Sequence, residues 1–203
     1  MRTYSRLIDA LALYLAQPVK RPGSSSTADP QSLAAVLVPG DVLLTDGNSR
    51  MAALVRRVTR SPWSHVAMYV GPLEEGADPR CIVEADVAGG VKAVRLSELK
   101  GLRVRVLRPR GLDDKLRRRL ADWVVSRIGG QYDLAHAWAL AKRLLRLPFA
   151  STLPKAQSAT RFICSTLVSH AFLLVGYSIV PDPSYVTPRD FETASVFEPV
   201  QTS

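Results

Sequence analysis

The chain of 203 residues, 47% of them hydrophobic and 22% charged, suits one compact domain with appendages better than two full domains. Its net charge of +9 favours an anionic partner, such as a phospholipid surface or a cell-wall polymer, although surplus arginine on solvated helix faces explains that charge equally well. Aromatic residues make up only 7% and no recognition module occurs, so we expect no nucleic-acid partner; two cysteines are too few for a disulfide framework or a structural zinc site.

Residues 1–17 have the spacing of a helix. Leu7, Leu11 and Leu15 recur every four residues, which predicts an amphipathic helix. Asp9 interrupts the apolar stretch, no convincing cleavage site closes it, and it is too short to span a bilayer. We therefore expect a cytoplasmic protein that is peripheral at the membrane, with export by a route without a classical signal as the alternative.

The next segment, 18–32, is rich in Pro, Ser and Gly and predicts a linker to a body that covers 33–203. The body opens with PGDVLLTDG, which predicts a short strand at 41–45. A helix is predicted at 48–59, capped by Asn48 or Ser49, with one apolar face formed by Met51, Leu54, Val55 and Val58.

Four short runs with strand character follow, at 65–71, 81–87, 91–99 and 102–109. The short turns between them predict an antiparallel meander. Apolar residues then recur at helical spacing over 112–128, where Asp113 or Asp114 can cap the start, and further helices are predicted at 132–147 and 164–176. Strands followed by helices indicate the α+β class, with a meander or partial barrel packed against helices.

Cys164 is the candidate nucleophile. It lies in the first turn of the helix predicted at 164–176, where unpaired backbone N–H groups and the helix dipole favour a thiolate and can also bind an oxyanion. A small buried cysteine that only packs is the alternative for this position.

A thiolate nucleophile needs a base that can also protonate the leaving group, and histidine is the usual choice. His65 begins a predicted strand next to a turn, so its ring can project at the end of the sheet. His170 lies on the helix of Cys164 but on another face, and His136 is expected to be a surface or capping residue. His65 is therefore the best candidate.

A polar partner must then hold the histidine ring in its productive orientation. Glu84 lies on the predicted strand next to that of His65, and Asp86 shares its strand face and competes for the role. Exposed carboxylates on an edge strand are the alternative for both residues. No metal-ligand pattern, phosphate-binding glycine loop or GxSxG motif occurs, so no cofactor is expected.

Six segments in this order resemble the circularly permuted, papain-like branch of the NlpC superfamily of cysteine hydrolases, the YiiX/YaeF-like group, with lecithin:retinol acyltransferase-like enzymes as more distant relatives. The segments are PGDVLLT (39–45), SHVAMYVG (64–71), VEADVAGGVKAVRLSEL (83–99), GGQYD (129–133), FICSTLV (162–168) and TPRDF (187–191).

The resemblance implies a permuted papain-like fold with the nucleophile at a helix N-terminus. It also implies that Cys164 is the nucleophile, His65 the base, Glu84 the orienting carboxylate, and Tyr132 a hydroxyl near the oxyanion. The long basic stretch 141–161 and the N-terminal helix depart from the family pattern. The stretch could form a lid or a substrate-binding insertion.

These features predict a cysteine hydrolase or acyltransferase that cleaves an amide or ester through a thioester on Cys164. The basic charge and the N-terminal helix favour a lipid acyl substrate and an anionic membrane surface as partner, with a peptide or peptidoglycan amide as the close second. The alternative of another class is a non-catalytic module on the same fold that binds anionic lipid or cell wall.

Overall fold

A computed structural model describes residues 14–15, 17–18, 28–145 and 161–202. Most of the predicted N-terminal helix and the linker, and 146–160 of the basic stretch, lie outside the described residues. Helix α2 (Pro30–Val36) runs across the expected boundary between linker and body. The guanidinium of Arg50, at the start of helix α3 (Arg50–Thr59), donates a hydrogen bond to the Tyr14 hydroxyl, so the described part of the N-terminal segment contacts the body.

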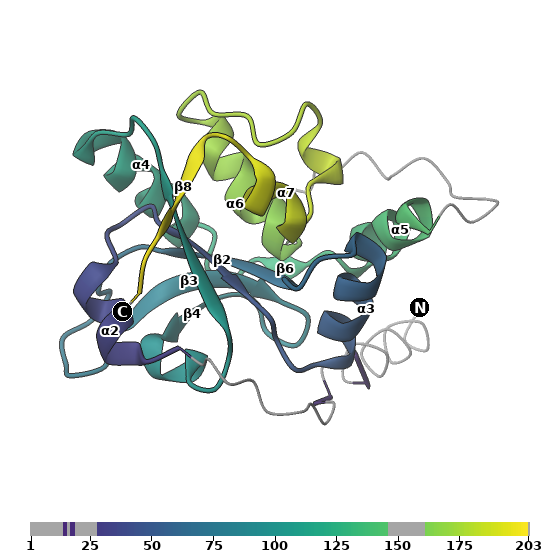
Figure 1. Ribbon diagram of the computed structural model, residues 1–203, viewed down its shortest axis with the longest axis horizontal. Coiled ribbons are helices and arrows are strands. Elements are labelled where there is room, and N and C mark those ends of the chain that lie inside the picture. Colours follow the sequence, from purple (N-terminus) through teal and green to yellow (C-terminus); the bar gives the residue numbers. More distant parts are fainter. Residues whose placement is uncertain (1–13, 16, 19–27, 146–160, 203) are drawn as a thin grey trace.

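Six strands form one open antiparallel sheet in the order β4-β3-β2-β1-β5-β8 (Figure 1). The strands are β1 (Val42–Thr45), β2 (His65–Tyr69), β3 (Arg80–Asp86), β4 (Gly90–Arg95), β5 (Val104–Pro109) and β8 (Phe197–Val200). The five predicted strands are therefore all present, and β8 is an addition that the sequence pattern did not indicate.

The strand order corrects the predicted meander in one place. Strands β1 to β4 are successive neighbours, but β5 pairs with β1, where Val106 lies opposite Leu43, and not with β4. The residues between β4 and β5 form the 3₁₀ helix η1 (Leu96–Leu99) and not a tight hairpin turn. Leu99 of η1 is buried in the core on one face of the sheet, so the chain crosses that face after η1. It then forms β5 on the side of β1 that is not occupied by β2.

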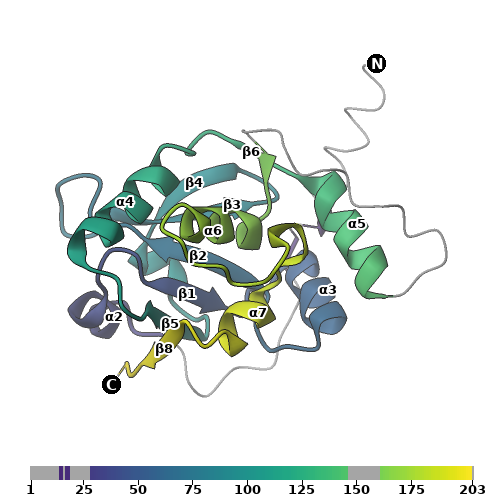
Figure 2. The ribbon, with the colours of Figure 1, turned by 90° about the horizontal axis from the view of Figure 1, so that it is seen from above.

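Helices cover both faces of the sheet (Figure 2). One face packs against α4 (Asp114–Val125), α6 (Cys164–Leu173) and α7 (Pro188–Thr193), and the other against α2 and η1. Helix α5 (Leu134–Leu144) lies beside α3 at one end of the sheet. The helices predicted within 33–203 are thus present, and together with the antiparallel sheet they confirm the α+β class. None of the helices in the described ranges combines the length and hydropathy needed to cross a bilayer.

The alternating side chains of the strands divide the core into two layers. Val42 and Leu44 of β1 pack with α4 and α6, whereas Leu43 between them packs with α2. Helix starts follow the predicted capping residues: Ser49 caps α3 and Asp113 caps α4, each by accepting a backbone N–H of the first turn.

Asp41, in the PGDVLLT segment, is a structural charge and lies apart from Cys164. Its carboxylate is fully buried and accepts hydrogen bonds from the Arg108 guanidinium at 2.7 and 3.0 Å and from the Val38 backbone N–H at 3.0 Å. Arg117 of α4 lies 3.7 Å away. The cluster therefore ties β1 to β5 and α4.

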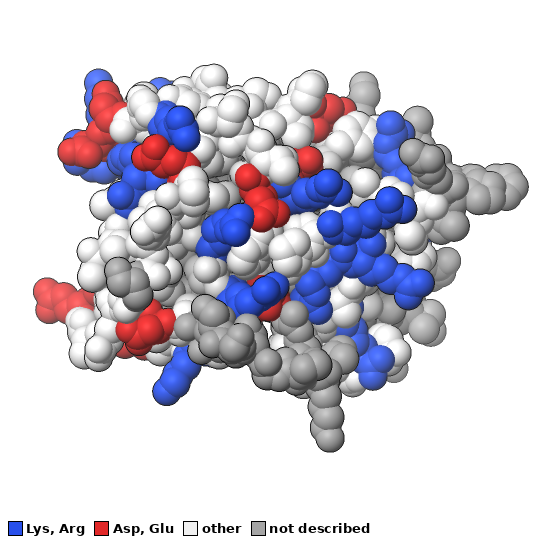
Figure 3. Space-filling model, viewed as in Figure 1, with Lys and Arg blue, Asp and Glu red and all other residues white. Residues whose placement is uncertain are grey.

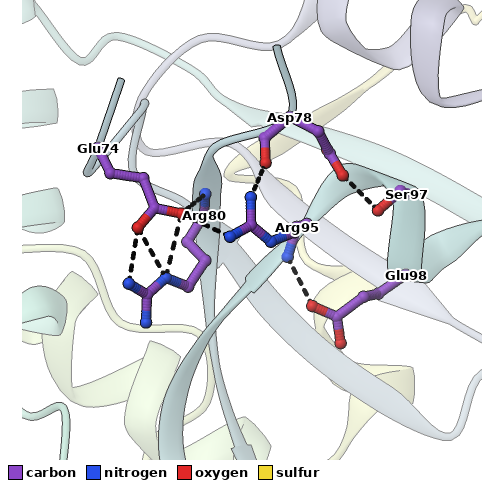
Figure 4. A network of polar contacts seen from close by, with 6 residues as sticks. All are labelled: Glu74, Asp78, Arg80, Arg95, Ser97 and Glu98. Atoms are coloured by element: carbon purple, nitrogen blue, oxygen red, sulfur yellow. Dashed lines mark hydrogen bonds and ion pairs between the residues drawn. The ribbon is translucent and has the colours of Figure 1, made fainter. Parts of the chain in front are cut away.

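A second polar network fastens the loop between β2 and β3 to β4 and η1 (Figure 4). Glu74 accepts a hydrogen bond from Arg80 at 2.6 Å and pairs with Arg95 at 2.9 Å, and Asp78 accepts from Arg95 and from Ser97. The side-chain and backbone hydrogen bonds from Arg80 lower the pKa of Glu74 to about 2. The network joins Glu74, Asp78, Arg80, Arg95, Ser97 and Glu98.

Candidate active site

Cys164 is the first residue of α6, and Ile163 precedes the helix as its N-cap. The backbone N–H groups of Cys164 and Ser165 belong to the first turn, where an α-helix provides no carbonyl partner. The thiol is buried, with 8% of the residue exposed. The most buried face of α6 packs on β2, which brings the start of the helix to the start of that strand.

His65 opens β2 and lies between Glu84 and Cys164. Its Nε2 is 2.9 Å from Oε2 of Glu84, and both side chains are mostly buried, with 23% and 16% exposed. Because Glu84 occupies Nε2, Nδ1 is the ring nitrogen left to face the thiol. His65 and Cys164 line the same cavity, and the charge and hydrogen bonding of the Cys164 side chain contribute to raising the pKa of the imidazole.

The structure separates the two carboxylates that the sequence left as competitors. Ala67 lies opposite Glu84 in the β2–β3 ladder, so a continued register would bring Asp86 opposite His65. The longer side chain of Glu84 instead reaches the ring diagonally, as cross-strand neighbours can. Asp86 pairs instead with Lys92 of β4, at 3.0 Å.

Lys92 is a member of this group that the sequence analysis missed. Its ammonium lies 3.5 Å from Oε1 of Glu84, so Glu84 is held by a cation on one side and by His65 on the other. The register could have revealed it: the ladder that pairs Asp86 with Gly90 also places Glu84 opposite Lys92.

The electrostatics of the group favour a charged pair. Burial alone would lower the pKa of His65, but the charges of Glu84 and Cys164 and the hydrogen bonds to both hold that pKa well above its ordinary value. Burial alone would raise the pKa of Glu84, but His65 and then Lys92 outweigh it and keep the carboxyl ionised.

Tyr132 lies in the short strand β6 (Gln131–Tyr132), which pairs in parallel with β7 (Arg161–Phe162) just before Cys164. Burial, and then the charges of Cys164, Asp86 and Asp133, raise the pKa of Tyr132 well above its ordinary value, so the phenol stays neutral and can donate a hydrogen bond. Gly90 secures this segment: a Cβ there would lie 2.2 Å from the Gly130 carbonyl oxygen, and its φ is +67°.

An apolar cavity of about 360 Å³ opens beside Cys164 between α3 and α5. The face of α3 that the sequence predicted as apolar lines it, together with the facing side of α5. The lining includes Met51, Leu54, Val55 and Val58 of α3, Ala137, Trp138, Leu140, Ala141 and Leu144 of α5, and Leu15, Tyr132 and Ile163.

A second cavity of about 260 Å³ also reaches Cys164 and is more polar. His65, Glu84, Asp86 and Glu98 line it, and it shares Met51, Val55, Tyr132 and Cys164 with the apolar cavity. The thiol therefore lies where an apolar compartment and a polar compartment meet.

The other reactive residues lie outside the group. His136, expected to be a surface or capping residue, is buried with 2% exposed. Its Nε2 donates to the Ser184 carbonyl at 2.8 Å, because the first turn of α5 faces η2 (Pro183–Tyr185). His170 donates from Nδ1 to the Thr166 carbonyl of its own helix. Cys81 is buried in the core layer on the α2 side, and burial raises the pKa of its thiol.

Comparison with known proteins places this geometry in a family context. A family model of permuted papain-like amidases, YaeF/YiiX, C92 family, matches residues 36–192. No curated protein matches the chain. The fold is similar to that of YiiX from Escherichia coli O157:H7, whose crystal structure is described as that of a metalloprotein, with a TM-score of 0.59 and 19% identity over 81% of this chain and 97% of that one. Within the described part of this chain, no three His, Cys, Asp or Glu side chains cluster as a metal site would require.

Proposed function

The chain belongs to the YaeF/YiiX (C92) family of permuted papain-like amidases, as the order of its segments predicted, and we propose that it cleaves an acyl amide or ester through a thioester on Cys164. The observation that carries the proposal is the 2.9 Å contact between Glu84 and His65 on the wall of the same cavity as the Cys164 thiol, which begins α6. A nucleophile, a base and an orienting carboxylate in this order are the requirements of covalent acyl transfer.

In the proposed reaction, the Cys164 sulfur attacks the acyl carbonyl and the thiol proton resides on His65. The oxyanion accepts hydrogen bonds from the N–H groups of Cys164 and Ser165 and from the neutral Tyr132 hydroxyl. The carbon–nitrogen or carbon–oxygen bond then breaks as His65 protonates the leaving amine or alcohol. Water, or an acceptor hydroxyl or amine, next gives its proton to His65 and releases the acyl group and the thiol.

The apolar cavity supports a lipid acyl group over a peptide as the preferred substrate. Its lining is almost entirely apolar, with Thr59, Ser165, Thr187 and Tyr132 as the hydroxyl-bearing exceptions, and it includes Cys164. A peptide leaves backbone N–H and C=O groups that would lack partners in such a compartment, whereas a hydrocarbon chain does not. The more polar cavity that also reaches Cys164 is available to the leaving group.

The test is acylation of the purified protein with p-nitrophenyl acyl esters, followed by mass spectrometry of the cysteine peptides. We expect an adduct on Cys164 that hydroxylamine removes, its loss in Cys164→Ala, and slower formation in His65→Ala. Cys81→Ala is the matched control because that thiol lies in the opposite core layer. An adduct on Cys81 alone, or a rate unchanged in His65→Ala, would overturn the proposal.

Alkylation with iodoacetamide tests the same group without any substrate. We expect Cys164 to react below about pH 7, where a free thiol is slow, Cys81 to stay unreactive, and His65→Ala to remove the difference. A Cys164 thiol that reacts no faster than Cys81 in both proteins would favour a non-catalytic binding module on this fold.

A further inference from the structure

The mouth of the apolar cavity carries large apolar side chains that face solvent. Trp138, Leu144 and Leu145 of α5 and its C-cap are 58%, 40% and 47% exposed. Trp138 and Leu144 also line the cavity, so the exposed apolar surface is continuous with its interior. An exposed tryptophan and two leucines at the opening of an apolar cavity indicate contact with an apolar medium.

The two helices that wall this cavity carry cations and no carboxylates. Residues 50–60 contain four arginines, 134–145 contain Lys142 and Arg143, and neither range contains Asp or Glu. The whole chain, by contrast, has 27 Lys and Arg against 18 Asp and Glu. Lys and Arg gather on the side of the molecule where α3 lies (Figure 3). The nearest acidic neighbour in sequence, Asp133, is engaged in capping the far end of α5.

We propose that this face docks on an anionic phospholipid bilayer and seats the mouth of the cavity on it. Trp138, Leu144 and Leu145 enter the boundary between headgroups and acyl chains, while Arg57, Arg60, Lys142 and Arg143 bind the headgroup phosphates. Arg57 and Arg60 are exposed on α3 and at its C-cap, and on α5 the Lys142 ammonium lies 5.6 Å from the Trp138 ring centroid, so a cation and an apolar anchor lie side by side there. The inference concerns binding and stands apart from the chemistry proposed for Cys164.

The combination of charges and apolar anchors distinguishes a bilayer from an anionic polymer. A duplex nucleic acid or a cell-wall polyanion would use the cations alone and leave Trp138, Leu144 and Leu145 in water, and a single strand that stacks on Trp138 would still leave the two leucines there. A bilayer uses both, because the cations are drawn to the anionic headgroups and the side chains gain by leaving water. The face therefore fits a membrane better than a soluble polyanion.

The experiment is sedimentation of the full chain, as the Cys164→Ala protein to exclude turnover, with vesicles of phosphatidylcholine alone and of phosphatidylcholine with about one quarter phosphatidylglycerol. We expect binding to the anionic vesicles, weakened by salt. Each cation near such a surface contributes about fivefold in affinity, so Arg57→Glu with Arg60→Glu lowers binding at least about thirtyfold. Arg118→Glu with Arg119→Glu, an exposed pair on α4 at the other end of the sheet, makes the same change in net charge and leaves binding largely intact.

The apolar anchors have their own matched control. Leu144→Ser with Leu145→Ser lowers binding roughly tenfold or more, since each leucine no longer enters the bilayer. Leu173→Ser with Leu174→Ser, 40% and 43% exposed at the end of α6 and outside the cavity lining, does not. Equal losses in test and control pairs, or full binding in the Leu144/Leu145 variant, would overturn the docking face. Thioester formation on Cys164 is measured separately in detergent-free solution, so either proposal can fail alone.

Discussion

If the apolar cavity holds the acyl chain, reactivity must rise with chain length until the cavity is full. Each methylene buried from water contributes about 0.8 kcal/mol, a factor of about four. From acetyl to hexanoyl, four added methylenes give about 3 kcal/mol, or about two-hundredfold in kcat/KM. The cavity of about 360 Å³ is in the range of ordinary ligand pockets, so the gain should stop at chains that outgrow it. The assay is kcat/KM for a series of p-nitrophenyl esters.

A larger side chain inside the cavity should abolish the rise of kcat/KM with acyl-chain length and leave the reaction of short acyl esters unchanged. Ala141 lines the cavity on α5, so Ala141→Phe occupies space that the longer chains need. We expect its kcat/KM for acetyl to stay within a few-fold of wild type, while the rise toward hexanoyl disappears. Ala53→Phe on α3 is the control, because Ala53 is equally half-buried and does not line the cavity. A flat series in the wild type, or the same loss in Ala53→Phe, would refute the assignment of the cavity to the acyl chain.

Three further changes test the group and the fold that supports it. Glu84→Gln removes the charge that helps to keep the pKa of His65 well above its ordinary value, so the imidazolium is lost at lower pH and the alkaline limb of the pH–rate profile moves down; an unmoved limb would contradict the role of Glu84. Asp41→Ala removes a fully buried carboxylate and leaves two partly buried arginines without it, so it should lower the free energy of unfolding in urea by about 3–5 kcal/mol. Glu192→Ala, which removes a more exposed pair, should lower it by about 1 kcal/mol or less. Gly90→Ala places a Cβ against the Gly130 carbonyl oxygen at a positive φ. We expect it to raise the activation free energy of thioester formation by more than it lowers the free energy of unfolding in urea, whereas a larger loss of unfolding free energy would assign the glycine a general role in stability.

The periodic segments could be read from the sequence because each has one apolar side. Ser49 and Asp113 cap the helices that their positions predicted, and strands β1 to β4 follow the turns between them. The position of β5 could not be predicted, since the choice between β4 and β1 depends on where η1 packs. That packing rests on Leu99 and the opposite core layer, which are contacts between residues far apart in sequence.

The candidate site could likewise be predicted only in part. Strand order brings His65 and Glu84 into neighbouring strands, which sequence could indicate, but the choice of Glu84 over Asp86 depends on side-chain length and on the competing attraction of Lys92 for Asp86. The sequence predicts His136 to be a surface or capping residue within its helix. Its burial follows from the packing of 184–185 on α5, a contact that no local pattern encodes.

The fold assigns the apolar face of α3 a different role from the one that its spacing indicates. Met51, Leu54, Val55 and Val58 have the spacing of a core-facing helix, yet they line a cavity that opens beside Cys164. Because α3 buries this face against α5 only in part, apolar surface is left open to a ligand between the two helices. Cys164 and the exposed Trp138 both line this cavity. If both proposals hold, a hydrocarbon chain from a bilayer would lie along the cavity with its carbonyl at the thiol, and the polar compartment that also reaches Cys164 would decide whether water or another acceptor takes the acyl group.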